Sequence, residues 1–249
     1  MPGTMTTLTV DGKPVDAYVA VPQGPGPFPG VAVAMHVFGV DRFVRGKCDE
    51  LAQAGYIAVA PYLFHRESVS NDALTGIAFD DPKRRETAMP MKDRLVDSQI
   101  QADMLAAVAH IRSLPQASGR VGVTGFCIGG RIAYLMGVTS KEFGAAGIWY
   151  GTEPHLPWGH QGASPQALTK ELACPVVGFF GNEDANPSPE MVDSLGAALR
   201  AAGKDYEFHR YDGAPHAFND PFNPVRFTPK AAADSWPKFI AFFDRYLKA

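Results

Sequence analysis

The fold of this chain is decided by one stretch, Arg120–Arg131, with the sequence R-V-G-V-T-G-F-C-I-G-G-R. The apolar, β-branched start of this stretch, residues 121–124, predicts a short buried strand, and residues 130–138 predict a helix. Between them, Gly125 and Gly129 flank Cys127 in the pattern G-x-nucleophile-x-G. This pattern is typical of a sharp strand-to-helix turn that presents a nucleophile, with cysteine in the usual place of serine. The pattern alone is weak evidence, so an acid and a histidine must follow it at suitable places.

Strand and helix patterns alternate on both sides of this turn. Apolar runs of strand length lie at residues 15–21, 30–34, 56–60, 145–150, 175–181 and 206–211, and helical patterns lie at 42–54, 93–112, 188–203 and 229–247. Such alternation predicts an α/β protein with a mostly parallel sheet of about seven to eight strands and helices on both faces. No repeat or linker interrupts the pattern, so we expect a single domain over residues 1–249.

One long segment departs from the alternation. Residues 63–92 are polar, mixed in charge and poor in periodicity. Long loops of compact domains are often functional, so we expect a lid or a substrate-binding excursion at the mouth of a site. A solvated surface excursion is the alternative.

Composition narrows the classes of protein. The chain has 249 residues and a net charge of −3, which does not indicate a nucleic-acid or anionic membrane partner. No apolar run is long enough for a transmembrane helix, and the N-terminal residues lack the layout of a secretory signal. Three widely spaced cysteines, Cys48, Cys127 and Cys174, suit a reducing compartment. We therefore expect a soluble, cytoplasmic protein that is a monomer or a small homo-oligomer.

Four polar side chains follow predicted strands: His36, Cys127, Asp184 and His216. In parallel sheets, ligands bind beyond the carboxyl ends of the strands, so we expect these groups to gather at one edge. A thiol attacks a carbonyl as thiolate, an imidazole takes its proton, and a carboxylate fixes the imidazole tautomer. The order cysteine, aspartate, histidine matches the chain order of α/β-hydrolases. It predicts Cys127 as nucleophile, Asp184 as acid and His216 as base.

Each of these assignments has an alternative. Cys127 would otherwise be a buried structural cysteine, and His216 a turn histidine bonded to backbone. Glu183 and Asp212 compete with Asp184, although Asp212 lies in an Asp-Gly turn, where local hydrogen bonding explains it.

A tetrahedral oxyanion needs two hydrogen-bond donors. The backbone N–H of Ile128, directly after the nucleophile, is one candidate. The second is expected from the loop after the apolar strand at residues 30–34, where Val37 stands.

Five motifs together resemble the dienelactone hydrolase (carboxymethylenebutenolidase) family of α/β-hydrolases. They are H-V-F-G-V at 36–40, G-Y-I-A-V-A-P-Y at 55–62, G-F-C-I-G-G at 125–130, G-N-E-D at 181–184 and Y-D-G-A-P-H-A-F at 211–218. The resemblance implies an α/β-hydrolase fold over nearly the whole chain and a hydrolase without a cofactor. It also implies a triad of Cys127, Asp184 and His216 and an oxyanion hole at Val37 and Ile128.

The sequence departs from the family pattern in two places. Family members carry a glutamate that interacts with the resting thiol, and His36 stands at that position here. We expect His36 to be a thiol partner, either accepting the thiol proton or pairing as imidazolium with a thiolate. The family binds a substrate carboxylate with two arginines. One of them corresponds to Arg85, whereas Asn219 and Asp220 follow His216 where the other would lie, with Arg226 as a candidate replacement.

The sequence therefore predicts a thiol-dependent hydrolase of a lactone or small carboxylic ester, with a small molecule as its partner. A general carboxylesterase or thioesterase and a non-catalytic ligand-binding protein are the alternatives. No metal site is expected, because His155 and His160 beside Trp158 lack further ligands.

Overall fold

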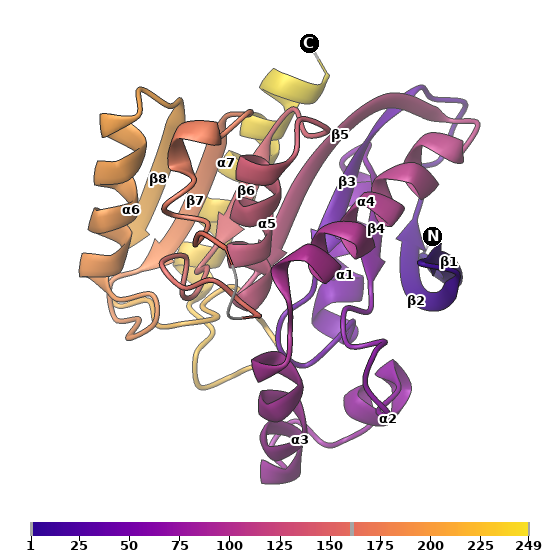
Figure 1. The fold of residues 1–249 in the computed structure, drawn as a ribbon, viewed down its shortest axis with the longest axis horizontal. Coiled ribbons are helices and arrows are strands. Elements are labelled where there is room, and N and C mark those ends of the chain that lie inside the picture. The colour runs from indigo at the N-terminus through magenta and orange to yellow at the C-terminus, as the bar shows by residue number, and fades with distance from the viewer. Residues whose placement is uncertain (1, 160–161, 249) are drawn as a thin grey trace. The chain divides into compact units, whose positions relative to one another are not determined.

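The computed structural model describes residues 2–159 and 162–248. The chain forms two compact units, Met1–Arg120 with Trp158–Gln161 and Val121–Pro157 with Gly162–Ala249. Each unit contains strands covered by helices (Figure 1).

The first unit holds strands in the order β1-β2-β4-β3. Their bounds are β1 (Thr4–Val10), β2 (Lys13–Ala20), β4 (Ile57–Pro61) and β3 (Phe28–Ala34). The pairs β1–β2 and β2–β4 are antiparallel, whereas β3 and β4 run parallel, with Gly30 opposite Ile57. Both β4 and the last six residues of β3 are fully buried, as their unbroken apolar sequences require.

Two helices pack on these strands: α1 (Arg42–Gln53) and α4 (Asp97–Ser113). Asp41 is the N-cap of α1, and its carboxylate accepts hydrogen bonds from the N–H groups of Phe43 and Val44. The loop from residue 36 to residue 41 therefore joins the carboxyl end of β3 to a capped helix.

Two further helices occupy the segment between β4 and α4. They are α2 (Asn71–Thr75), capped by Ser70, and α3 (Pro82–Asp93), capped by Asp81 with Pro82 in its first turn.

The second unit holds four parallel strands in the order β5-β6-β7-β8, from β5 (Ala117–Phe126), β6 (Ala146–Trp149) and β7 (Val176–Gly181) to β8 (Tyr206–Tyr211). The strand ends lie in register, because Phe126 pairs with Trp149, and Gly181 with Tyr211. The turns that follow these four strands consequently begin along one edge.

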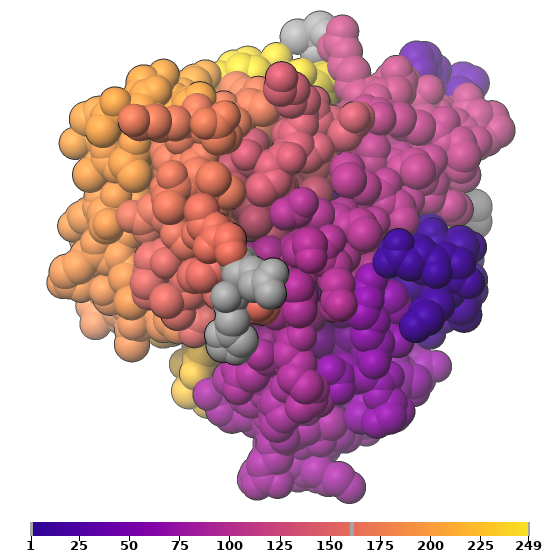
Figure 2. All heavy atoms as spheres, in the orientation of Figure 1, coloured from indigo at the N-terminus to yellow at the C-terminus, as the bar shows by residue number. Residues whose placement is uncertain are grey.

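Three helices complete this unit: α5 (Ile128–Thr139), α6 (Pro189–Ala201) and α7 (Pro229–Leu247). The outer side of α6 is open to solvent (Figure 2, orange). A short 3-10 turn lies at Thr169–Glu171. In the core, Trp149 stacks on Phe179 at a ring distance of 4.3 Å, and Phe239 of α7 packs against both rings. The apolar stripe of the last helix is thus core.

The predicted fold class is confirmed: among the described residues the chain has eight strands, mostly parallel, flanked by helices. Two features were not predicted: the strand β1, and the helices α2 and α3 in residues 63–92, where periodicity is poor. The role of that segment as a lid or substrate-binding excursion stays a prediction. The helix expected from residue 93 begins at Asp97, since α3 ends at Asp93. No helix in the described part of the chain is long and apolar enough to cross a membrane.

Candidate active site

Cys127 lies at the turn between β5 and α5, in a backbone conformation that residues other than glycine rarely adopt. Its φ is 59° and its ψ is −120°, and it is the N-cap residue of α5. Its N–H donates to the carbonyl of Trp149 at 3.0 Å, which anchors the turn to β6. This is the geometry expected of a nucleophile elbow.

Gly130 of the motif is explained by close packing. The first turn of α5 passes close to the backbone at the end of β6. A Cβ on Gly130 would lie 2.7 Å from the Cα of Gly151 and 2.8 Å from the carbonyl oxygen of Trp149. Backbone atoms cannot move aside cheaply, so only glycine fits this position.

Asp184 and His216 follow β7 and β8 and meet through their side chains. The Nδ1 atom of His216 lies 2.8 Å from Oδ2 of Asp184, and Oδ1 of Asp184 accepts the N–H of Asn186 at 2.8 Å. The side chain of Asp184 is only 3% exposed. A buried carboxylate with two partners fixes the orientation of the imidazole ring and holds its proton on Nδ1.

Backbone contacts bring the acid and base loops together. The N–H of Glu183 donates to the carbonyl of Ala214 at 3.0 Å. A Cβ on Gly181 would lie 2.0 Å from the same oxygen, so the two loops touch at a position that excludes any side chain. Of the three candidate acids, Asp184 is the one bonded to His216, whereas Glu183 is exposed and Asp212 bonds Asn182.

The electrostatics of His216 connect it to Cys127. Burial opposes the charged imidazolium, but the charge of Cys127 and the hydrogen bonds to Asp184 and Cys127 outweigh burial and raise the pKa of His216 to about 10. Because Nδ1 is held by Asp184, it is Nε2 that faces the sulfur. The arrangement is suited to an imidazolium–thiolate pair at neutral pH.

Tyr150, which contacts His216, was not singled out by the sequence. The ring of Tyr150 lies edge-on to His216, 4.9 Å between centroids, and its hydroxyl donates to Oδ1 of Asn219 at 2.5 Å. The position of Tyr150 directly after β6, at the strand-end edge, was the available signal. Asn219 and Asp220 are both buried.

The two predicted oxyanion donors lie after different strands: Ile128 at the start of α5, and Val37 in the loop after β3. Ile128 is the first residue of α5, so its N–H is one of those that a helix leaves without an internal partner. The N–H of Val37 donates to no acceptor among the residues that the structure describes. Val37 belongs to the first unit and Ile128 to the second.

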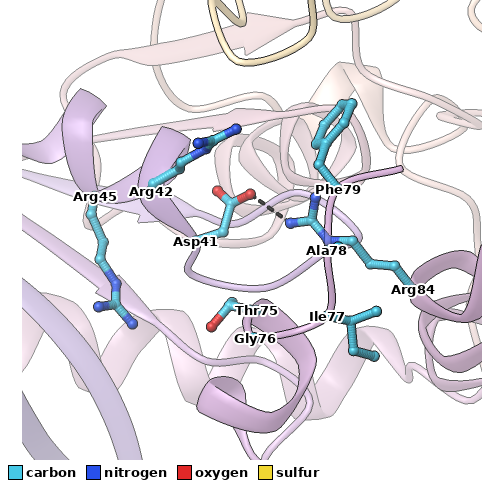
Figure 3. A pocket seen from close by; sticks show the side chains of 9 residues that line it. All are labelled: Asp41, Arg42, Arg45, Thr75, Gly76, Ile77, Ala78, Phe79 and Arg84. Atoms are coloured by element: carbon cyan, nitrogen blue, oxygen red, sulfur yellow. Dashed lines mark hydrogen bonds and ion pairs between the residues drawn. The ribbon is translucent and has the colours of Figure 1, made fainter. Parts of the chain in front are cut away.

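His36 lies in a buried polar chain that the sequence did not predict. Its Nε2 is 2.9 Å from Oδ1 of Asp41, and its Nδ1 accepts the N–H of Phe38 at 3.2 Å. Arg84 of α3 donates to Oδ2 of Asp41 at 2.8 Å (Figure 3). An acceptor at Nδ1 requires an unprotonated nitrogen, so these bonds favour the neutral His36 that donates through Nε2.

Burial disfavours the charged form of Asp41, but His36 and Arg84 outweigh it and hold the pKa of Asp41 well below its usual range. Arg85, the neighbour of Arg84, is exposed on α3.

A cavity of about 420 Å³ opens beside the Asp41–Arg84 pair. It is lined by Asp41, Arg42, Arg45, Thr75, Gly76, Ile77, Ala78, Phe79 and Arg84 (Figure 3). His160, one of the two histidines considered for a metal, lies outside the described residues. Across 2–159 and 162–248, no group of three or more His, Cys, Asp or Glu side chains is placed to hold a metal ion.

Comparisons with known proteins agree on one family. A model of the dienelactone hydrolase family matches residues 15–247. A protein of Escherichia coli strain K12 with the name "putative carboxymethylenebutenolidase" is 33% identical over 246 residues, 97% of this chain and 86% of that protein. The carboxymethylenebutenolidase of Pseudomonas putida is 28% identical over 217 residues, 84% of this chain and 82% of that protein.

A crystal structure described as a putative dienelactone hydrolase from Klebsiella pneumoniae subsp. pneumoniae MGH 78578 has a TM-score of 0.86 to this chain, at 29% identity and 98% coverage of both chains. Fold and comparisons together define a hydrolase with the α/β-hydrolase fold. Within that class, the chain belongs to the dienelactone hydrolase family, as a carboxymethylenebutenolidase-like enzyme.

Proposed function

We propose that this protein hydrolyses a lactone or small carboxylic ester through a thioester with Cys127. The observation that carries the proposal is the hydrogen-bonded chain from Asp184 through His216 to Cys127, with the thiol on a strand-to-helix elbow. Three groups from three separate turns meet with the connectivity that nucleophilic catalysis requires.

In the first half of the reaction, the Cys127 thiolate attacks the carbonyl carbon. The N–H groups of Ile128 and Val37 hold the oxyanion of the tetrahedral intermediate. The intermediate collapses with cleavage of the C–O bond, and the imidazolium of His216 gives its Nε2 proton to the leaving oxygen. The alcohol, or the ring-opened end of a lactone, is thereby released from the carbonyl.

In the second half, the now neutral His216 takes a proton from water as the hydroxide adds to the thioester. Collapse expels the Cys127 thiolate and yields the carboxylic acid, which restores the thiolate–imidazolium pair. Asp184 keeps Nδ1 protonated throughout and stabilises the imidazolium.

His36 is proposed as a second partner of the thiol. The bonds to Asp41 and Phe38 favour its neutral form, so the positive partner of the thiolate in this proposal is His216.

The test compares wild type with Cys127→Ala on p-nitrophenyl acetate, with mass spectrometry of the quenched wild type. We expect complete loss of turnover in the variant and a mass increase of one acetyl group on the peptide that contains Cys127. Residual turnover in Cys127→Ala at the wild-type rate would overturn the proposal and favour a binding protein with adventitious esterase activity.

For substrates, we propose that Arg85 binds the carboxylate of a dienelactone. Its exposed position on α3 leaves the guanidinium accessible. A panel of cis- and trans-dienelactone, simple lactones and p-nitrophenyl esters, run on wild type and Arg85→Ala, tests this. A selective loss on carboxylated substrates is expected; equal activity of the two enzymes on them would remove Arg85 from the site.

A second candidate function is a general esterase or thioesterase for uncharged acyl groups. It is favoured by the buried Asp220, which follows His216 in the chain where a substrate-binding arginine was expected, since a carboxylate in a substrate site disfavours an anionic substrate. Similar turnover of aryl acetates and dienelactones in the same panel would support it.

We also propose a cytoplasmic location. The three cysteines are free thiols, as expected in a reducing compartment.

A further inference from the structure

We infer that residues 63–92 act as a clamp on the loop at residues 36–41, with Asn71 and Arg84 as positioning residues for the oxyanion donor of Val37. The inference rests on the proposed function, because it concerns the transition state of that reaction. It assigns roles to two side chains that contact no reacting atom.

Asn71 forms two hydrogen bonds with the backbone of Val40. It is 1% exposed, its Oδ1 accepts the N–H of Val40 at 2.8 Å, and its Nδ2 donates to the carbonyl of Val40 at 3.3 Å. One side-chain amide thus satisfies both backbone groups of a single residue, much as an adjacent strand would. Arg45 adds a third bond, from its Nε to the same carbonyl at 2.9 Å.

Arg84 contacts both ends of the loop at residues 36–41, one of them through Asp41. It is 4% exposed, and it donates to Oδ2 of Asp41, whose Oδ1 meets His36. Its guanidinium carbon also lies 4.5 Å from the centre of the Phe38 ring. A single arginine of α3 therefore contacts the last residue of the loop, its middle through Phe38, and its first residue through Asp41.

Three of the four N–H groups of residues 37–40 have acceptors within the loop or on Asn71. Phe38 donates to Nδ1 of His36 at 3.2 Å, Gly39 to the carbonyl of His36 at 3.1 Å, and Val40 to Asn71. In the part of the chain that the structure describes, the N–H of Val37 has no such acceptor. The clamped conformation commits the other three donors and leaves this one for a ligand oxygen.

The physical gain is preorganisation. A donor stabilises a developing oxyanion most when it is already in place, since no reorganisation is then needed during the reaction. Six residues outside the named strands and helices would otherwise sample more conformations, at an entropic cost each time they order.

The same contacts argue against a lid that opens at these two helices. Opening would separate Arg84 from Asp41 and strip Val40 of buried hydrogen bonds, and both changes leave polar groups unpaired. Asn71 and Arg84 therefore tie α2 and α3 to the loop at residues 36–41.

The test measures kcat and KM on p-nitrophenyl acetate for Asn71→Leu and Arg84→Met. Oxyanion stabilisation occurs only in the transition state, so we expect kcat to fall by about 10-fold or more with KM unchanged. Lys83→Met, an exposed neighbour on α3, is the matched control and should keep wild-type kcat.

A second readout separates positioning from general damage. Alkylation of Cys127 by iodoacetamide forms no oxyanion, so its rate should be unchanged in Asn71→Leu. Asn71→Asp retains the acceptor for the N–H of Val40 and should retain more kcat than Asn71→Leu. Arg84→Lys, which keeps the cation, should likewise exceed Arg84→Met, and both conservative variants serve if the larger changes prevent folding.

Two results would overturn the clamp: wild-type kcat in Asn71→Leu and Arg84→Met, or a loss of alkylation that parallels the loss of kcat. Either result leaves the proposed function standing if Cys127→Ala is inactive. Turnover that survives in Cys127→Ala would instead remove the reaction on which the clamp depends.

Discussion

The backbone at Cys127 has a positive φ of 59°, a region that glycine prefers and that branched or bulky residues avoid. The turn places the sulfur beyond the strand end, where it faces Nε2 of His216. A residue in such a conformation indicates that its position matters more than its local stability.

The first prediction concerns the resting state of this thiol. With His216 as its charged partner, Cys127 should be alkylated by iodoacetamide at pH 6 much faster than a free cysteine, which is almost entirely protonated there. His216→Ala should reduce the rate to that of a free thiol, whereas His36→Ala should retain most of it. If His36→Ala lowered the alkylation rate more than His216→Ala did, His36 would be the charged partner of the thiolate.

The second prediction concerns His216 itself. Its pKa is raised to about 10 by Cys127 and Asp184 against the effect of burial, so its ring should titrate near that pH in NMR spectra of the wild type. Cys127→Ala removes one of the raising charges and should bring the titration down towards the ordinary histidine value.

The same raised pKa has a consequence for stability. The imidazolium contributes fully below the ordinary histidine pKa, near 6.5, and its contribution is lost as the pH rises through about 10. The free energy of unfolding, from urea titrations, should therefore fall as the pH approaches 10, and fall less in Cys127→Ala. Parallel curves for the two proteins would contradict this coupling.

At the scale of elements, α3 is joined to α1 through a buried ion pair. Arg84→Met leaves the buried Asp41 carboxylate without the guanidinium that bonds its Oδ2, and breaking a buried ion pair by removing one partner typically costs about 3–5 kcal/mol. We expect a loss of this size in urea unfolding, and a smaller loss in the double variant Asp41→Asn/Arg84→Met, where no buried charge is left unpaired. The exposed Arg94–Glu67 pair, at 2.6 Å, is the control: Arg94→Met should change stability little.

The elements that the sequence predicted well were those with a single dominant signal. The runs that became β3, β4, β6 and β7 are continuous and apolar, and Ser188-Pro189 marks the start of α6. The strand β1 has a mixed sequence, T-M-T-T-L-T-V, and buries only Leu8 and Val10. Its signal was the Asp11-Gly12 pair before β2, a turn that favours a hairpin.

The helix α3 was missed for a different reason. Its apolar face is very small, with Ala88 and Met91 buried, and the third buried residue is Arg84. A buried arginine cannot be told from a surface one by periodicity, because its burial depends on Asp41 far away in the chain. The Asp81-Pro82 start was the readable signal.

The site divides in the same way. The positions of Cys127, Asp184 and His216 after β5, β7 and β8 could be predicted from the apolar strands before them, whereas the bond between Asp184 and His216 could not; their catalytic roles stay a prediction. The bonds that connect His36, Asp41 and Arg84 could not be predicted from the sequence. Asp41 resembles an ordinary helix cap there, and Arg84 is one charged residue within a run of charges.

For the whole molecule, the three cysteines report on the folded state. Burial raises the pKa of the Cys48 thiol and raises that of Cys174 to about 12, so neither is a nucleophile while the protein is folded. A disulfide reagent such as DTNB should therefore label one thiol per native chain and three in denaturant. Loss of the native signal in Cys127→Ala would assign it, and labelling of two or three native thiols would show that the core opens.

Within the second unit, Cys127, Asp184 and His216 follow strand ends, and Asp184 bonds His216. Within the first unit, side chains from α1, α2 and α3 hold the loop at residues 36–41.

The two bonds between Asn71 and Val40 have a practical meaning for enzyme engineering. The stretch that contains Asn71 has a polar sequence of poor periodicity, so loop grafting to broaden substrate range would choose it first. A graft that replaced position 71 without a side-chain amide would produce a well-folded library with uniformly poor turnover, and the fault would be attributed to the new loop's specificity. Keeping positions 71 and 84 constant while randomising the exposed residues between them separates recognition from rate.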